Sequence, residues 1–154
     1  MPSIVRDFKP DDVTGIMRLI KEFEAETSVA KKIGGVNENF FGGYLMKCWA
    51  SGLVKILVLE DNKKVVGSLA VMVGVDLFNG KLFLSELFWF VTKEARGNAN
   101  AMKMLEMMEK FAKLSGCRYI SMFHLFDVKA EKIKRFYEKI GYTHTQNMYI
   151  KEFD

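Results

Sequence analysis

Cysteine is scarce in this sequence, and no stretch is apolar enough to span a membrane. Only Cys48 and Cys117 occur among the 154 residues, each in a segment that favours regular structure. This pattern excludes a disulfide framework and a cysteine-ligated zinc site, and it is typical of reduced thiols in a cytoplasmic protein. The longest apolar run, residues 82–91, is interrupted by Ser85 and Glu86. We therefore expect no membrane partner and no secretory leader.

A strong excess of basic charge is also absent. The 23 Lys and Arg residues exceed the 19 Asp and Glu residues enough to attract phosphates, but they form no basic stripe. We therefore expect no nucleic-acid partner. The alternative interpretation, a nucleic-acid-binding or inhibitory protein, is supported by the isoelectric point alone. Apolar residues, in contrast, make up 49% of the chain, with thirteen Phe and ten Met. This supply suits the core of one domain covering residues 1–154.

The hydrophobic periodicity changes several times along the chain and predicts the order β-α-α-β-β-β-α-β-α-β-β. Three strands joined by short polar turns, followed by strand–helix units, favour a mixed α/β sheet with helices on both faces. Asp11 or Asp12 is the expected cap of the first helix and Asp127 that of the last, while residues 27–36 are expected to form a loop. The predicted helices are residues 13–26, 37–51, 96–115 and 128–140. The predicted strands are residues 4–8, 54–60, 65–75, 81–91, 119–124, 142–145 and 148–153.

The junction at residues 88–101 carries the clearest chemical signal. A strand runs into a polar turn and then into small residues that begin a helix. Backbone N–H groups at a helix N-terminus bind anions, and small side chains let a pyrophosphate approach them. Arg96 adds a positive charge at the mouth. The same spacing also fits an ordinary strand-to-helix turn closed by small residues, so it does not decide between the two interpretations.

This junction resembles the acetyl-CoA-binding motif of the GNAT superfamily of N-acetyltransferases, which reads Gln/Arg-x-x-Gly-x-Gly/Ala. Ala99 stands where the family usually has glycine; alanine admits a phosphate less freely and disfavours a positive φ. Residues 86–91 are also similar to a subgroup found among phage-encoded members. By the resemblance, the following residues bind the cofactor: Phe90, Val91, Arg96, Gly97, Asn98, Ala99, Asn100 and Ala101.

Residues 133–142 provide a second, separate resemblance. They are similar to the closing signature of the family, a helix that ends Phe-Tyr-x-x-x-Gly-Phe/Tyr. In the family, the tyrosine at this place protonates the departing CoA thiolate, and Tyr137 occupies it. A phenol with a pKa of about 10 is a competent donor to a thiolate. The alternative is that Tyr137 only fills the helix–sheet interface beside Phe136.

Glu86 is unusual because it is a carboxylate in the middle of an apolar strand. Burying it is costly unless it is paired or its pKa rises, and either condition suits a general base for an ammonium substrate. In the family, a glutamate on this strand deprotonates the amine directly or through water, and a bulge splays the strand so that the pantetheine arm can enter. The alternatives are a solvated Glu86 or one paired with lysine. His124, at the end of its predicted strand, is a weaker catalytic candidate.

The resemblance implies an α/β, GNAT-like acyl-CoA N-acyltransferase fold, with a mostly antiparallel sheet of about seven strands that is splayed in its middle. It implies an acetyl-CoA-dependent N-acetyltransferase without a metal, in which Glu86 and Tyr137 act during direct transfer to a primary amine on a small molecule or a peptide. An inactive acyl-CoA-binding or protein-interaction domain of the same fold is the alternative that Ala99 motivates. Whether the chain forms a homodimer is left open by the sequence. Four aromatic residues are expected on the acceptor side or in the core: Phe40, Phe41, Tyr44 and Trp49.

Overall fold

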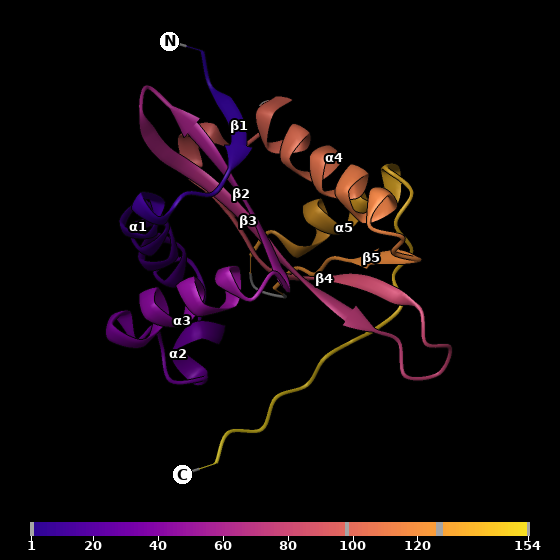
Figure 1. The fold of residues 1–154 in the computed structure, drawn as a ribbon. Helices are drawn as coiled ribbons and strands as arrows, with labels where there is room; N and C mark the ends of the chain where they lie inside the picture. The colour runs from indigo at the N-terminus through magenta and orange to yellow at the C-terminus, as the bar shows by residue number, and fades with distance from the viewer. Residues whose placement is uncertain (1, 98, 126–127, 154) are drawn as a thin grey trace.

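The computed structural model describes residues 2–97, 99–125 and 128–153, and these build a five-stranded mixed sheet (Figure 1). The strands follow each other in chain order across the sheet; the first four are antiparallel to their neighbours and the last is parallel to its own. The predicted mostly antiparallel sheet is therefore confirmed. The strands are β1 (Ile4–Asp7), β2 (Val54–Asp61), β3 (Lys64–Val75), β4 (Leu82–Val91) and β5 (Tyr119–Ser121).

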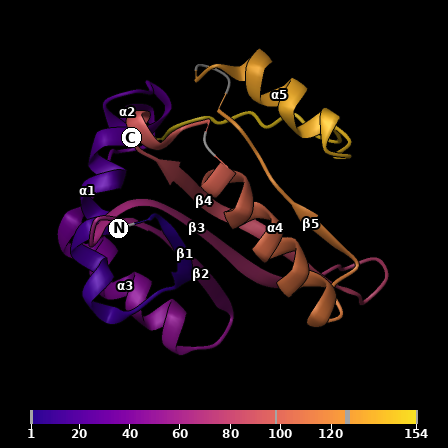
Figure 2. The same cartoon turned by 90° about the horizontal axis from the view of Figure 1, so that it is seen from above.

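Helices cover both faces of this sheet, as predicted. Figure 2 shows α1 and α3 on one side, and α4 with α5 on the other. Strand β2 is buried on both faces: Ile56 and Val58 pack in the cluster under α1 and α3, while Leu57 and Leu59 pack in the cluster under α4. A strand covered on both faces has a continuous apolar sequence. The helices are α1 (Val13–Glu24), α2 (Val29–Lys32), α3 (Glu38–Ala50), α4 (Ala99–Leu114) and α5 (Ala130–Lys139).

The helix boundaries follow local chemistry in some places and not in others. The second predicted helix, α3, begins where expected, and Asn37 caps it, because its side chain accepts a hydrogen bond from the N–H of Phe40 at 3.1 Å. The carboxylate of Asp12 does not cap α1; it accepts from the N–H of Lys9 and from the guanidinium of Arg6. The segment predicted as a loop at residues 27–36 contains the short helix α2. The predicted cap Asp127 lies outside the described residues.

The strand prediction was wrong at the C-terminus, which accounts for five strands in the described chain instead of about seven. Residues 142–145 and 148–153 form no strand, and every residue from 143 to 153 is exposed. Residue 119 begins β5 as predicted, but the strand ends at Ser121 instead of residue 124. A β-type sequence becomes a strand only beside a hydrogen-bonding neighbour, and these segments have none within the described chain.

A bulge in β4 fixes the geometry of the middle of the sheet. Ala70 pairs with Phe88 but the next residue, Val71, pairs with Glu86, so Leu87 is an extra residue in β4. Glu86 therefore faces the α4 side with Val71, whereas Phe88 faces the α1 side. Beyond the bulge β4 has no ladder with β5, which pairs only with residues 83–85. The predicted bulge and splayed sheet are confirmed.

Candidate active site

Glu86 lies where β4 and β5 separate, directly after the last pair of their ladder, Ser85 with Ser121. Its side chain is buried, and Oε2 accepts a hydrogen bond from the backbone N–H of Phe123 at 3.0 Å. Burial raises the pKa of Glu86 to about 8, and the hydrogen bond from Phe123 offsets only part of that effect. This excludes the solvated-face interpretation. The carboxyl group therefore exchanges its proton close to neutral pH.

Tyr137 binds the other backbone polar group of the same residue, Phe123. It comes from the buried stripe of α5, and its hydroxyl donates to the carbonyl of Phe123 at 3.4 Å. Its ring lies 5.3 Å from that of Tyr142 and 5.5 Å from that of Phe136. Burial and then the negative charge of Glu86 raise the pKa of Tyr137 above its ordinary value. The phenol thus keeps its proton until a strongly basic group takes it.

The turn before α4 requires its glycine. Gly97 has φ +77°, a conformation that strains other residues, and no atom lies within 4 Å of the place where its Cβ would be. Ala99, in contrast, is the first residue of α4 and does not have a positive φ. The departure from glycine at this position therefore causes no backbone strain. Asn100 and Ala101 lie in the first turn of α4, and Asn98 lies outside the described residues.

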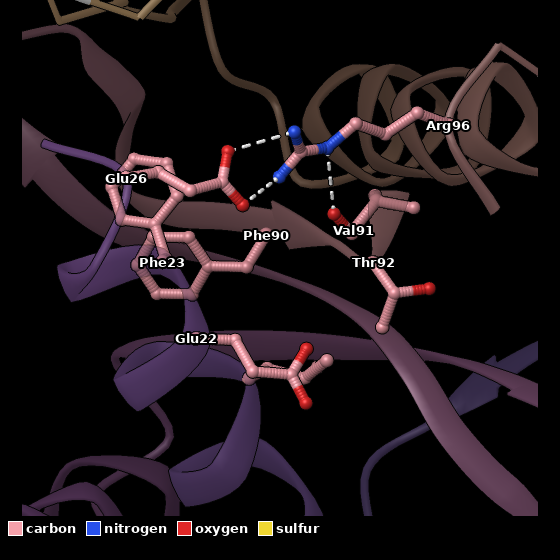
Figure 3. Close-up of a pocket in the computed structure, with 8 residues that line it drawn as sticks. Glu22, Phe23, Glu26, Phe90, Val91, Thr92 and Arg96 are labelled. Atoms are coloured by element: carbon pink, nitrogen blue, oxygen red, sulfur yellow. Dashed lines mark hydrogen bonds and ion pairs between the residues drawn. The ribbon is translucent and has the colours of Figure 1, made fainter. Parts of the chain in front are cut away.

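Arg96 connects the end of β4 to the segment after α1 (Figure 3). Its Nε donates to the carbonyl of Val91 at 2.9 Å, and its two terminal nitrogens donate to the two carboxylate oxygens of Glu26 at 2.7 and 2.8 Å. This bidentate pair lowers the pKa of Glu26. Phe90 lies beside it, with its ring 4.5 Å from that of Phe23. An anion that binds Arg96 must therefore compete with Glu26.

A cleft of about 690 Å³ opens beside Arg96 and Gly97. Its walls come from the segment after α1, from the turn before α4 and from the start of α5. Figure 2 shows the starts of α4 and α5 on the same side of the molecule. Lys93, Lys129 and Lys132 join Arg96 there, so four cationic side chains surround one carboxylate, that of Glu26. Such a cleft favours an anion. These three lysines are not recognisable as a group from the sequence, because only the fold brings the start of α5 beside the turn before α4.

Comparison with known proteins decides what kind of domain carries this arrangement. Residues 52–144, more than half of the chain, match the family described as acetyltransferase (GNAT) domain. The chain belongs to the GNAT family. Acyl transfer is the general chemistry of this family, and its members typically use acetyl-CoA as co-substrate. The more specific likeness of residues 86–91 to phage-encoded members stays a prediction.

Solved structures share the GNAT fold at low sequence identity. Glucosamine-6-phosphate N-acetyltransferase from Arabidopsis thaliana is 21% identical with a TM-score of 0.77, and both chains are covered completely. A transcriptional regulator from Bacillus halodurans C-125 is 16% identical with a TM-score of 0.80, over 99% of this chain and 100% of that one. A ribosomal-protein-alanine N-acetyltransferase from Brucella melitensis biovar Abortus 2308 is 12% identical with a TM-score of 0.76, over 99% and 100%. No curated protein matches the chain in sequence.

The indole N–H of Trp89 is a buried hydrogen-bond donor of the GNAT domain. The residue follows the bulge in β4, and its ring centre lies 6.4 Å from that of Phe136 in α5. Its indole Nε1 is buried, and none of the described residues accepts a hydrogen bond from it. A buried unsatisfied donor is rare and costs about 1–3 kcal/mol, so it calls for an acceptor.

The aromatic residues expected on the acceptor side divide between two roles. Phe41 packs against Phe88 with ring centres 6.2 Å apart, and Trp49 meets the ring of Phe8 edge to face. Phe40 and Tyr44 stack on each other at 4.9 Å and remain largely exposed. Phe41 therefore belongs to the core, whereas Trp49 remains 36% exposed, and Phe40 and Tyr44 stay available for an acceptor.

The surroundings of His124 and of the two cysteines give less support to a catalytic role. The ring Nδ1 of His124 lies 3.4 Å from the carbonyl of Leu125, and burial raises the pKa of the Cys117 thiol, which disfavours its thiolate. Cys48 packs against the core under α1 and α3. Among the residues that the structure describes, no helix is long and apolar enough to cross a membrane. Within that same part of the chain, no three His, Cys, Asp or Glu side chains gather into a possible metal site.

Proposed function

We propose that this chain is an acetyl-CoA-dependent N-acetyltransferase that transfers an acetyl group directly to a primary amine in a ternary complex. One observation carries the proposal: Glu86 and Tyr137 converge on Phe123 where β4 and β5 separate, and β4 leads from there to the basic cleft. From Glu86 to Val91 that strand runs five residues, or ~17 Å. A ligand that reaches both places is long, with phosphates at one end and its reactive group at the other.

The described residues fit acetyl-CoA in their chemistry. Arg96 and the lysines of the cleft suit phosphate oxygens, and the beginning of α4 adds the positive end of a helix. The open space above Gly97 leaves room for a pyrophosphate close to the backbone. The indole N–H of Trp89 offers a donor to an amide carbonyl. When bound, acetyl-CoA supplies the acetyl group as an activated thioester.

The two buried groups divide the proton transfers between them. Glu86, with a pKa of about 8, takes a proton from the amine directly or through a water molecule. Tyr137, whose raised pKa keeps it protonated, donates a proton to the departing sulfur. The main chain of Phe123 holds both side chains in place, because its N–H binds the first and its carbonyl binds the second.

A domain of the same fold that transfers nothing is the second candidate. The pairing of Arg96 with Glu26 favours it, since the guanidinium expected to bind pyrophosphate already has a carboxylate partner. This candidate predicts that no amine releases CoA. The acceptor amine and the cytoplasmic location remain predictions from the sequence.

A thermal-unfolding shift with acetyl-CoA tests the cofactor site, with CoA and adenosine 3′,5′-bisphosphate as controls. Ligand at about 100 times its Kd stabilises the folded state by ~2.7 kcal/mol, a shift of several degrees for a chain of this size. We expect Lys132→Ala, which removes a lysine of the cleft, to reduce the shift. Lys139→Ala, at the far end of the same helix, is the matched control.

Release of CoA with a panel of amines then tests the transfer. We expect at least one primary amine to release CoA at a rate that depends on its concentration. A thermal shift without CoA release for any amine would support the binding domain. No shift at millimolar ligand would contradict the cofactor site itself.

A further inference from the structure

Helix α3 presents a stacked pair of aromatic rings on the face that turns away from α1. The rings of Phe40 and Tyr44, one helical turn apart, have centres 4.9 Å from each other and planes inclined by only 20°. Gly42 faces α1, since a Cβ there would lie 3.3 Å from the side chain of Val13. Phe40 and Tyr44 lie two residues before and after Gly42, about 200° around the helix, so both turn away from α1. They are 61% and 55% exposed.

The ring pair lies on the side of α3 where Glu86 is found. Helix α1 packs on β4 at Phe90, and α3 packs on it at Phe88 through the ring of Phe41. Glu86 comes next in the same direction, two residues or ~7 Å further along the strand. The order across this face is therefore α1, α3 and then the part of β4 that carries Glu86. The ring pair, on the far side of α3 from α1, borders that part.

The sheet beyond α3 adds apolar side chains that are open to solvent. Met72 pairs with Ser85, the residue before Glu86, and is 43% exposed. It shares a face with Ala70, which packs in the cluster under α1 and α3. Leu87, the extra residue of the bulge, is 40% exposed. We call four side chains the apolar surface: Phe40, Tyr44, Met72 and Leu87. Apolar surface beside a reactive group is typical of a small-molecule site.

The carboxylates on this side of the sheet are already engaged within the protein. Residues 13–50, which build α1, α2 and α3, contain four glutamates, and each has a partner. Their partners are as follows: Arg18 for Glu22, the N–H of Val36 for Glu24, Arg96 for Glu26 and Lys21 for Glu38. A second ammonium group on an acceptor would have to displace one of these partners or stay unpaired against apolar side chains. Either event costs binding free energy.

We propose that the acceptor carries a single ammonium group on an apolar, preferably aromatic, body, and that Phe40 and Tyr44 bind this body. The inference rests on the proposed function, because it places the amine at Glu86. Since the two rings are stacked before the acceptor arrives, they lose little side-chain freedom when it binds. Amines with several ammonium groups, such as polyamines and aminoglycosides, are poor acceptors. Transfer forms the C–N bond of an amide and breaks the C–S bond of the thioester. Of the two protons that the ammonium loses, one ends on the sulfur of CoA and one is released.

Rates with matched amines test the substrate class. Hexylamine and 1,6-diaminohexane have the same carbon chain, and the second compound adds one ammonium group. We expect kcat/KM to be at least about tenfold higher for hexylamine. We expect 2-phenylethylamine to exceed ethylamine by at least about the same factor, because the phenyl ring leaves water. An equal or higher kcat/KM for 1,6-diaminohexane, or for ethylamine, would overturn the substrate class and leave the proposed function standing.

The variants Phe40→Ala and Tyr44→Ala test where the apolar body binds. Each should raise KM for 2-phenylethylamine about five- to tenfold, with kcat and the Kd of acetyl-CoA within about twofold, because the rings contact the body equally before and during transfer. Leu114→Ala is the matched control, since it removes an apolar side chain that is 79% exposed on α4 and should change none of these values. An unchanged KM in both ring variants would contradict the role of the ring pair.

Calorimetry of amine binding to the protein saturated with CoA separates this inference from the proposed function. We expect 2-phenylethylamine to bind the native complex, and to bind at least about fivefold more weakly to the complex of Phe40→Ala. Binding of this kind without CoA release for any amine would remove the proposed function and leave the apolar site standing. Release of CoA with other amines, but no binding of 2-phenylethylamine, would overturn the inference alone.

Discussion

The carboxylate of Glu86 and the phenol of Tyr137 bind opposite polar groups of one residue, Phe123. Its N–H donates to Glu86 at 3.0 Å, and its carbonyl accepts from Tyr137 at 3.4 Å. The two side chains come from a strand and a helix separated by fifty residues of sequence, and the main chain of one residue holds both. A proton acceptor and a proton donor are thus held together at the place where the sheet opens.

Removing the phenol of Tyr137 should slow the chemical step and leave binding intact. We expect Tyr137→Phe to lower kcat about 100-fold, the lower range for a general acid, with little change in the Kd of acetyl-CoA. Steady-state rates and calorimetric binding measure the two quantities. Tyr142→Phe is the control, because that hydroxyl binds Glu109 and not Phe123. Unchanged turnover in Tyr137→Phe would remove this residue from the mechanism.

The buried carboxyl group of Glu86 should make the protein less stable as the pH rises. Its pKa is about 8 in the folded chain against 4.5 when unfolded, so between these values the folded state holds a proton that the unfolded state has lost. Stability is therefore lost as the pH rises from 4.5 to about 8, by up to about 5 kcal/mol.

Glu86→Gln provides the measurement of this effect. The amide keeps an oxygen that can accept from Phe123 and does not titrate, so the variant should lose less stability than the native protein between pH 5.5 and 8. Urea unfolding at the two pH values gives the difference. Equal losses in both proteins would mean that Glu86 titrates normally.

Releasing Arg96 from Glu26 should strengthen cofactor binding. Glu26→Gln removes the charge that competes with a phosphate for the guanidinium, and we expect the Kd of acetyl-CoA to fall about two- to fivefold. Glu22→Gln is the matched control, since Glu22 lines the pocket of Figure 3 together with Glu26 and Arg96 but pairs with Arg18. Calorimetric titration measures both variants. A higher Kd for Glu26→Gln would show that Glu26 helps to position Arg96 for the ligand.

Restoring the glycine of the family motif should not improve the site. Because Ala99 has no positive φ, Ala99→Gly relieves no strain, and it lowers helix stability by up to about 1 kcal/mol. We expect the Kd of acetyl-CoA to stay within about twofold and the melting temperature to fall slightly. Gly97→Ala should be worse in both respects, because its φ is +77°. A tenfold lower Kd of acetyl-CoA in Ala99→Gly would show that the alanine side chain hinders cofactor binding.

The sequence predicted the features that depend on neighbouring residues. Glu86 stands out because a charge inside an apolar strand must be accommodated, and the structure buries it with a raised pKa. The start of α3 near Asn37 and the turn of small residues before α4 also depend only on local sequence. Each of these features can be recognised from a few neighbouring residues of the sequence.

Features that depend on distant segments were not visible. The pair between Arg96 and Glu26 joins positions seventy residues apart, and Lys132 lines the same cleft as Gly97 only because the fold brings α5 there. The prediction of two C-terminal strands was wrong for a related reason. Their residues favour a strand, but sequence preference cannot supply the neighbour that a ladder needs.

The link through Phe123 has a consequence for how this position tolerates replacement. Both hydrogen bonds use the main chain, so the benzyl group, which is 46% exposed, takes no part in them. Nearly any amino acid can fill position 123 and keep the arrangement, and proline is the exception because it has no N–H to offer Glu86. Related sequences can therefore differ freely at a residue on which both proton-transfer groups depend.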